Sequence, residues 1–304
     1  MKNNQLMIYG AYGYAGELMV REAVAQGLRP IIAGRDDEKL KPIATELSLE
    51  CRAFGVRNTG SNLQDISVLL NCAGPFSATA EPLARACLAQ QIHYLDITGE
   101  IDIFRKCHAL DEEARQQNVL ILPGAGTDIV PTDCLAAMLK EKLPVATRID
   151  LALSFGTNPS IGTVNTMIES FGKGGLIREG GMLKVVSNAF QMRKIPFQNK
   201  PQWAMTIPWG DVFTSGISTG VPDGAVYMAM PRMSIYMIRL TNPVKGILNT
   251  QFGQKITKRL AGWLMKKGPD AKALEAGRGQ FWGEAEAPDG EKLEMTMSTP
   301  NVYA

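Results

Sequence analysis

Short apolar runs alternate with amphipathic helical patterns along roughly the first half of the chain. We expect strands at 6–9, 30–33, 52–54, 68–72, 94–97 and 119–122, and helices at 14–26, 38–46, 81–90, 102–117 and 132–142. The strands are almost entirely apolar, which is typical of strands buried on both faces of a parallel sheet with helices on each side. The pattern predicts a doubly wound α/β domain.

The pattern changes after about residue 144. Residues 148–155 alternate like a half-buried strand, a Gly- and Thr-rich stretch follows to Gly181, and further strands are expected at 224–230, 280–286 and 292–298. We therefore expect two domains, a parallel-sheet domain at 1–145 and an α+β domain with a mostly antiparallel sheet at 146–304.

The composition argues against several classes of protein. The 304 residues are 45% hydrophobic and 20% charged with a net charge of +2, which is ordinary for a globular protein and too balanced for a nucleic-acid binder. The five cysteines are widely spaced without a Cys-x-x-Cys pair, which argues against a disulfide framework or a zinc site. No signal peptide or long apolar span is predicted, so we expect a cytoplasmic protein. We also expect no metal site.

Three glycines follow the first strand and open the first helix. Gly10 suits a tight strand-to-helix turn, Gly13 lets backbone approach a diphosphate, and Gly16 permits close helix packing. The helix N-terminus offers unpaired N–H groups to phosphates, so the turn favours dinucleotide binding in a Rossmann domain over a purely structural role. The cofactor-binding residues expected in this turn are Gly10, Tyr12, Gly13, Tyr14, Ala15 and Gly16.

The tip of the second strand indicates which dinucleotide binds. An NAD-binding site usually has an acid there, whereas this chain has Arg35, which can pair with a 2′-phosphate. Asp36 complicates the interpretation because an inward-pointing carboxylate would repel that phosphate. Alternatively, Arg35 is a surface charge paired with Asp36 or Asp37. We expect NADP(H) as the cofactor, with NAD(H) as the alternative.

The loop after the fourth long strand is a second candidate cofactor contact. Gly74 and Pro75 would hold backbone close to the nicotinamide ribose at the carboxyl edge of the sheet, together with Ala73 and Phe76. The alternative is a turn that needs Gly-Pro for its own geometry.

Several segments together resemble the saccharopine dehydrogenase-like NAD(P)-binding family, including its trans-acting enoyl reductase homologues. The more particular ones are Asp-Ile-Thr-Gly-Glu at 96–100, Thr-Asp-Ile-Val-Pro-Thr-Asp at 127–133 and Pro-Trp-Gly-Asp-Val at 208–212. The resemblance implies a Rossmann domain followed by a sheet domain that closes the active site and often supports homodimers. The chain is shorter than the saccharopine-forming enzymes, so their substrate is not transferred. The family usually continues beyond its final segment into a helix that is absent here, and the sequence alone does not tell whether the natural chain continues beyond Ala304.

Acidic residues at strand ends are the candidates for chemistry. A hydride transfer needs a group that stabilises or protonates the atom gaining charge. Glu100 and Asp128 are the first choices and Asp211 the third, with Asp96 and Asp133 also near strand ends or helix starts. The alternative is that such acids merely cap helices. We expect an oxidoreductase that transfers hydride to a C=N or conjugated C=C bond of a small or acyl substrate.

The remaining candidates are weaker. His93 precedes its strand and His108 lies within a helix, so neither supports histidine-driven catalysis, and Cys72 and Cys134 are expected to be small buried residues. Residues 232–267 are basic and partly amphipathic, which permits weak contact with a membrane surface, although an ordinary solvated helix explains the pattern as well. A non-enzymatic NADP(H)-binding redox sensor remains the alternative function.

Overall fold

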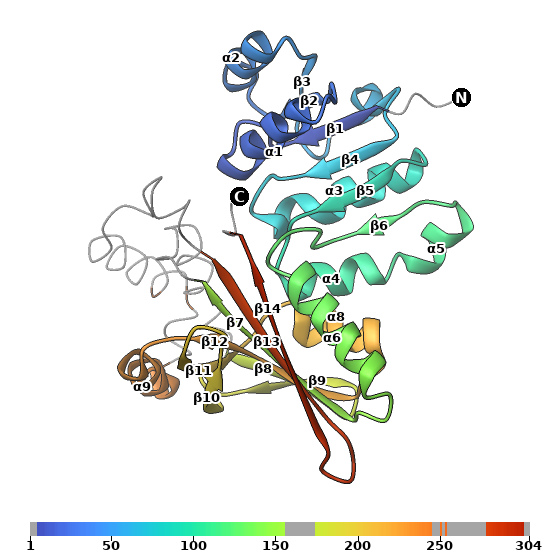
Figure 1. Cartoon of the computed structure of the whole chain (residues 1–304). Coiled ribbons are helices and arrows are strands. Elements are labelled where there is room, and N and C mark those ends of the chain that lie inside the picture. Colours follow the sequence, from blue (N-terminus) through green and yellow to red (C-terminus); the bar gives the residue numbers. More distant parts are fainter. Residues whose placement is uncertain (1–4, 156–173, 245–249, 251–252, 254–277, 301–304) are drawn as a thin grey trace. The chain divides into compact units, whose positions relative to one another are not determined.

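The computed structural model describes residues 5–155, 174–244, 250, 253 and 278–300, which belong to two compact units (Figure 1). The units are Met1–Asp128 and Ile129–Ala304, so the division lies before the position near 145 expected from the sequence. The reason is helix α6 (Val130–Lys142), which packs against helix α8 and strand β13 of the second unit.

The first unit contains a six-stranded sheet with the order β3-β2-β1-β4-β5-β6, and every neighbouring pair is parallel. This order confirms the doubly wound Rossmann arrangement, in which the strand order reverses between β1 and β4. The strands are β1 (Leu6–Tyr9), β2 (Ile31–Gly34), β3 (Cys51–Ala53), β4 (Val68–Asn71), β5 (His93–Asp96) and β6 (Ile121–Leu122).

Helices cover both faces of this sheet because side chains alternate along each strand. Ile8 and Ile32 pack with buried residues of α1 and α2, whereas Met7 and Tyr9 pack on the opposite face with α3, α4 and α5. The helices are α1 (Tyr14–Ala25), α2 (Asp37–Leu47), α3 (Phe76–Ala89), α4 (Ile101–His108) and α5 (Asp111–Gln116), with a 3-10 turn at Gly60–Leu63.

Two helices differ from the sequence prediction. The helix expected at 102–117 is two helices, because the chain turns at Ala109 and Leu110 and the acidic start of α5 begins a new helix. The helix expected at 81–90 begins earlier, at Phe76.

The second unit contains an eight-stranded mixed sheet with the order β10-β11-β12-β7-β13-β14, and β8 pairs with β12 and β9. Among the described strands, only β7 and β12 pair in parallel, which confirms the mostly antiparallel sheet. The strands are β7 (Arg148–Phe155), β8 (Gly175–Glu179), β9 (Met182–Val186), β10 (Met192–Pro196), β11 (Pro201–Ile207), β12 (Asp223–Ala229), β13 (Gly279–Glu286) and β14 (Lys292–Thr299). Its further helices are α8 (Asp211–Thr219), α9 (Arg232–Leu240) and a 3-10 turn at Asn242–Val244.

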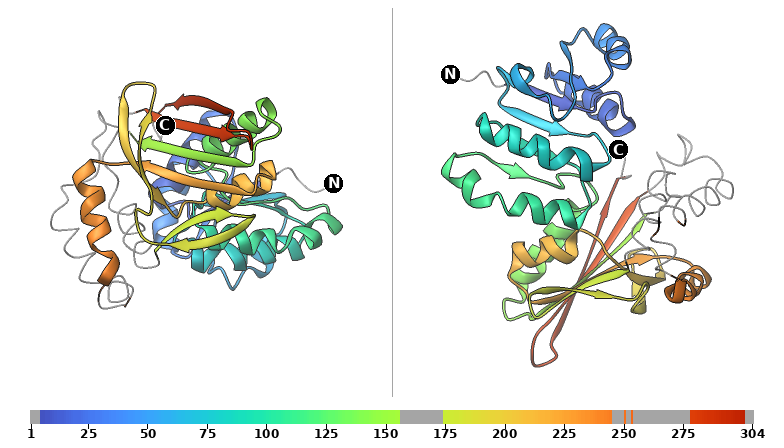
Figure 2. Two further views of the ribbon diagram at one scale, coloured as in Figure 1. Left: turned by 90° about the horizontal axis from the view of Figure 1, so that it is seen from below. Right: turned by 180° about the vertical axis from the view of Figure 1, so that it is seen from behind.

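The two faces of this second sheet are packed differently. Helix α6 approaches β13 closely, since a Cβ on Gly283 would lie 2.6 Å from Leu139 Cδ1. A separate cluster that includes Trp282, Tyr227 and Ile195 packs on the strands of this sheet. Figure 2 shows these strands in two further views. Among the described residues, no helix is both long and apolar enough to cross a bilayer.

Candidate cofactor and active site

The glycine turn lies where β1 meets the loop after β4. Gly10 has a φ of +86°, and its N–H donates a 2.7 Å hydrogen bond to the Ala33 carbonyl. A Cβ on Gly10 would lie 2.7 Å from the Ala73 nitrogen, and one on Gly16 would lie 2.2 Å from the Gly10 oxygen. Two of the three glycines are therefore required for the turn itself.

Gly13 has a different environment and forms the N-cap of α1. A Cβ on Gly13 would have only the Gly10 oxygen within 4 Å, at 3.2 Å, so the space on its other sides is open. In the described structure, no side chain caps the first turn of α1, and Tyr14 at its start is exposed. An open helix N-terminus of this kind fits the diphosphate of a dinucleotide.

The tip of β2 carries one unpaired cation. Arg35 is exposed, and within the described part of the chain its guanidinium makes no hydrogen bond or ion pair. Asp36 instead caps α2 through the Lys39 N–H at 3.3 Å and pairs with the Lys39 ammonium at 3.2 Å, which lowers the pKa of its carboxyl group. The carboxylate that complicated phosphate binding is thus held by Lys39, and Arg35 fits a 2′-phosphate.

Tyr12 links this tip to the glycine turn. A Cβ on Gly34 would lie 2.6 Å from Tyr12 Cε1, so the phenol ring occupies the space beside Gly34. The Lys39 ammonium lies 5.6 Å from the centre of the same ring. Tyr12 therefore lies among the residues that we expect to surround the adenosine end of the cofactor.

The loop after β4 is held by a buried amide. Asn71 Oδ1 accepts a 3.0 Å hydrogen bond from the Ala73 N–H, and Thr79 Oγ1 donates to the Ala73 carbonyl at 2.6 Å. Gly74 and Pro75 are exposed at the tip, joined by a cis peptide bond, and α3 starts at the next residue. The loop lies beside Gly10, at the carboxyl edge where the cofactor is expected.

A buried hydrogen-bond network, which no local pattern in the sequence indicated, joins the ends of β4, β5 and β6. Asp96 is fully buried; its carboxylate accepts hydrogen bonds from the Tyr94 hydroxyl at 2.8 Å and from the N–H groups of Thr98 at 3.0 Å and Gly124 at 2.8 Å. Asn71 Nδ2 in turn donates to the Tyr94 hydroxyl at 3.1 Å. Burial raises the pKa of Asp96, although the two N–H donors oppose that effect. Asp96 therefore fixes loops and is not exposed to a substrate.

Two of the predicted acids lie on the loops that this network holds. A Cβ on Gly99 would lie 3.5 Å from Asp128 Oδ2, so the Asp128 carboxylate lies against the loop after β5. Burial raises the pKa of Asp128 to about 6. Glu100 follows Gly99 at the N-cap position of α4, where its side chain accepts no capping hydrogen bond within the described helix.

The other sequence candidates are placed elsewhere. Asp211 is buried in the first turn of α8, in the second unit, and Asp133 accepts a 2.6 Å hydrogen bond from Ser218 on that helix. His93 Nδ1 accepts a hydrogen bond from the Leu120 N–H, which is a structural role. Burial raises the pKa of the Cys72 thiol to about 12, so it is a poor nucleophile. Cys134 was expected to be buried, but it lies on the solvent-facing side of α6.

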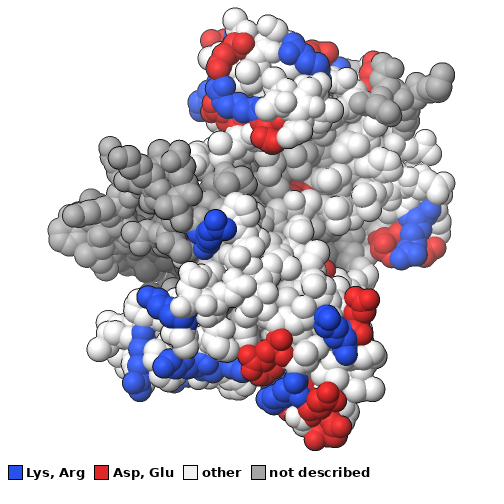
Figure 3. Space-filling view, viewed as in Figure 1, with Lys and Arg blue, Asp and Glu red and all other residues white. Residues whose placement is uncertain are grey.

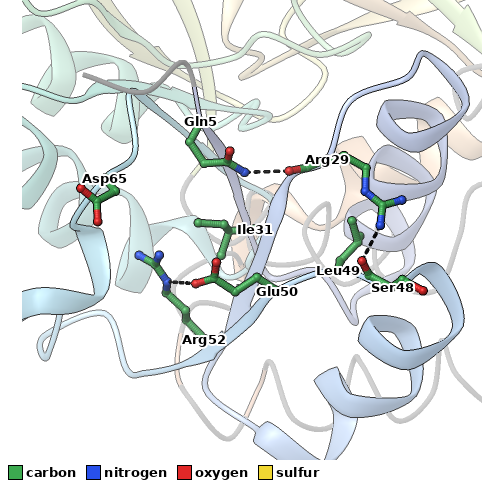
Figure 4. A pocket seen from close by; sticks show the side chains of 8 residues that line it. All are labelled: Gln5, Arg29, Ile31, Ser48, Leu49, Glu50, Arg52 and Asp65. Carbon is green, nitrogen blue, oxygen red and sulfur yellow. Dashed lines mark hydrogen bonds and ion pairs between the residues drawn. The ribbon is translucent and has the colours of Figure 1, made fainter. Parts of the chain in front are cut away.

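One described pocket, of about 370 Å³, lies at the opposite, amino edge of the Rossmann sheet (Figure 4). Its cations are already engaged, since Arg29 donates to the Ser48 carbonyl and Arg52 pairs with Glu50. This pocket is therefore not part of the candidate site. The described residues contain no group of three or more potential metal ligands among His, Cys, Asp and Glu.

The match to a known family covers the elements that build this site. A model of the saccharopine dehydrogenase NADP binding domain matches residues 6–122, from β1 to β6. The first unit is therefore similar to the NADP-binding domain of saccharopine dehydrogenases. This match confirms the resemblance inferred from the motifs, and it confirms NAD(P)(H) as the class of cofactor.

Relatives found by sequence agree with that match. A saccharopine dehydrogenase-like oxidoreductase of Rattus norvegicus is 25% identical over 66% of this chain and 53% of its own length. A Mycobacterium tuberculosis protein named as a trans-acting enoyl reductase is 28% identical over 60% of this chain and 44% of its own. The chain thus spans about half the length of the curated relatives that it matches.

Saccharopine dehydrogenase (L-Glu forming) from Saccharomyces cerevisiae has a similar fold. Its apo structure superposes with a TM-score of 0.63 over 98% of this chain and 85% of that chain, at 9% identity. At that identity the similarity describes the fold alone.

Proposed function

We propose that this saccharopine dehydrogenase-like chain is an NADP(H)-dependent oxidoreductase that reduces a C=N or conjugated C=C bond of a small or acyl substrate. One observation carries the cofactor half of the proposal. The open N-terminus of α1 and the unpaired guanidinium of Arg35 lie at the ends of neighbouring strands, as a diphosphate and a 2′-phosphate require.

Each part of the carboxyl edge has a role in this proposal. Bound NADPH would supply the hydride. The first turn of α1 binds the diphosphate, Arg35 binds the 2′-phosphate, and the exposed backbone at Gly74 and Pro75 positions the nicotinamide end. These contacts orient the cofactor over the ends of β4 and β5.

Asp128 is the proposed proton donor. With a pKa of about 6, a useful fraction of this carboxyl group remains protonated near neutral pH, whereas an ordinary aspartate is fully ionised. Glu100, one residue beyond the Gly99 contact, is proposed to bind a cationic or hydrogen-bonding group of the substrate. Asp211, which is buried in the first turn of α8, stays a third candidate for the acid.

Fluorescence titration of the purified chain with NADPH and NADH tests the cofactor half. We expect wild type to bind NADPH more tightly than NADH, and Arg35→Ala to weaken NADPH about tenfold to a hundredfold because a charge-assisted pair is lost. NADH binding should change little. Arg29→Ala, which removes an exposed arginine at the opposite edge of the sheet, is the matched control and should change neither affinity.

Turnover tests the catalytic half. A panel of imine, enoyl and carbonyl substrates is incubated with NADPH, and Asp128→Asn and Glu100→Gln are compared with wild type. Full activity in both variants would refute the assigned roles. NADPH binding without turnover on any member of the panel would favour a redox sensor instead.

A further inference from the structure

Helix α9 exposes a continuous apolar stripe, which we call the α9 stripe. Met233, Tyr236, Met237 and Leu240 are 71%, 38%, 60% and 72% exposed. Their spacing of three, four and seven residues places all four on one side of the helix. Ile235 is fully buried, so α9 is fixed to the second unit by a different side.

The stripe extends onto the neighbouring loop. The Arg239 guanidinium donates hydrogen bonds to the carbonyl groups of Ala189 at 2.9 Å and Phe190 at 3.5 Å. This contact holds the loop between β9 and β10 next to α9, and Phe190 is itself 44% exposed. Single exposed apolar residues are ordinary, but a grouped set on one surface indicates an interaction site.

Positive charge accompanies the stripe. The Arg232 guanidinium lies 5.0 Å from the centre of the Trp203 ring and 5.6 Å from that of Tyr236, and it donates to the Tyr236 hydroxyl. The sequence contains no Asp or Glu from Gly224 to Pro269. In Figure 3 the described surface over α9 correspondingly shows blue and white residues without red.

We propose that the α9 stripe is a peripheral docking surface for a lipid layer with anionic headgroups. Met, Leu and Tyr side chains enter the boundary between headgroups and acyl chains, while Arg232 and neighbouring cations attract the headgroup phosphates. The 9 residues of α9 make a helix roughly 13 Å long, far shorter than the hydrocarbon core, so the helix lies on the layer.

The charge distribution favours lipid over a second copy of the chain. A symmetric dimer through the α9 stripe would bring two basic surfaces together, and like charges across an interface oppose association. An anionic surface satisfies both the apolar stripe and its basic surroundings.

Cosedimentation of the full chain with vesicles tests the proposal. Neutral phosphatidylcholine vesicles are compared with vesicles containing about one third phosphatidylglycerol, and we expect preferential, salt-sensitive binding to the anionic ones. The double variant Met233→Ser/Met237→Ser should lower the apparent partition coefficient about tenfold, because two inserting side chains become polar. Arg232→Gln should weaken binding to anionic vesicles about threefold and leave neutral vesicles unaffected.

The matched control is Met182→Ser/Val185→Ser on β9, since these residues are 73% and 66% exposed in the same unit. This variant should bind vesicles like wild type, and circular dichroism checks that every variant is folded. No preference for anionic vesicles, or equal losses in the two double variants, would overturn the proposal. A dimer in light scattering that Met233→Ser/Met237→Ser dissociates would overturn it too, because a second copy would then occupy the stripe.

Discussion

The hydroxyl group of Tyr94 donates a 2.8 Å hydrogen bond to Asp96 Oδ2, and both side chains are fully buried in the first unit. The same carboxylate holds the N–H groups of Thr98 and Gly124, one on the loop after β5 and one on the loop after β6. A single anion thus organises the two loops that carry the proposed acids Glu100 and Asp128.

Replacing this anion should destabilise the chain. We expect Asp96→Asn to lower the free energy of unfolding by about 2–3 kcal/mol, because an amide cannot accept all three hydrogen bonds and leaves a buried donor unmatched. Urea denaturation followed by circular dichroism measures the change. Asp102→Asn, on the exposed side of α4, should change stability by less than about 0.5 kcal/mol. Equal effects in the two variants would refute the role of Asp96.

The raised pKa of Asp128 predicts a pH-dependent stability. Because its folded-state pKa of about 6 exceeds the ordinary aspartate pKa of 3.8, the folded chain binds this proton more tightly than the unfolded chain. The resulting stabilisation is complete below the unfolded pKa and is lost as pH rises through about 6. At pH 7.5 Asp128→Asn should therefore be more stable than wild type by roughly 2 kcal/mol, and the difference should vanish near pH 4. Thermal unfolding across this pH range measures it; a difference independent of pH would contradict the burial of the carboxylate.

A comparison of Gly10 with Gly27 distinguishes the cost of a positive φ from the cost of a steric clash, because their φ values are similar. Gly10 and Gly27 have φ values of +86° and +82°, but a Cβ meets Ala73 only at Gly10 and has nothing within 4 Å at Gly27. Gly27→Ala should cost about 1 kcal/mol through the backbone alone. Gly10→Ala should cost at least about 3 kcal/mol and abolish NADPH binding. Similar melting temperatures for the two variants would show that the turn tolerates the added carbon.

The contributions of Arg193 and Glu284 to the stability of the second unit should be strongly coupled. Arg193 makes two parallel hydrogen bonds of 3.0 Å to Glu284, which is almost buried, and its guanidinium lies 4.7 Å from the centre of the Trp282 ring. We expect Arg193→Met to cost about 2 kcal/mol, because Glu284 loses its main partner. Arg193→Met/Glu284→Gln should cost clearly less than the sum of the single changes. A double-mutant cycle from urea unfolding checks the coupling, and strict additivity would exclude it.

Local patterns were sufficient for the strands and the glycine turn of the first unit. The strands β1 and β4 and the glycine turn follow directly from apolar runs and from Gly10, Gly13 and Gly16, because buried parallel strands have no polar side to obscure them. The roles of Glu100, Asp128 and Asp211 stay predictions.

Long-range contacts were not visible in the sequence. The partners of Asp96 come from β5, the loop after it and the loop after β6, and no local spacing reveals such a network. Strand β8 lies in the stretch to Gly181 that was interpreted only as Gly- and Thr-rich, and β9 pairs with it directly afterwards. Helix α6 follows β6 in sequence but packs with the second sheet. Beyond residue 244, the basic stretch 232–267 lies outside the described residues except at 250 and 253.

The contact between Tyr12 and Gly34 also limits how cofactor preference could be engineered. Any side chain introduced at position 34 would displace the Tyr12 ring, which belongs to a different loop. Transplanting the β2 tip of an NAD-dependent enzyme would therefore fail unless the segment around Tyr12 were exchanged with it. The loop that carries Tyr12 and the tip of β2 that carries Arg35 should therefore be redesigned together. A library that varies both segments should yield more folded variants than one that varies the tip of β2 alone.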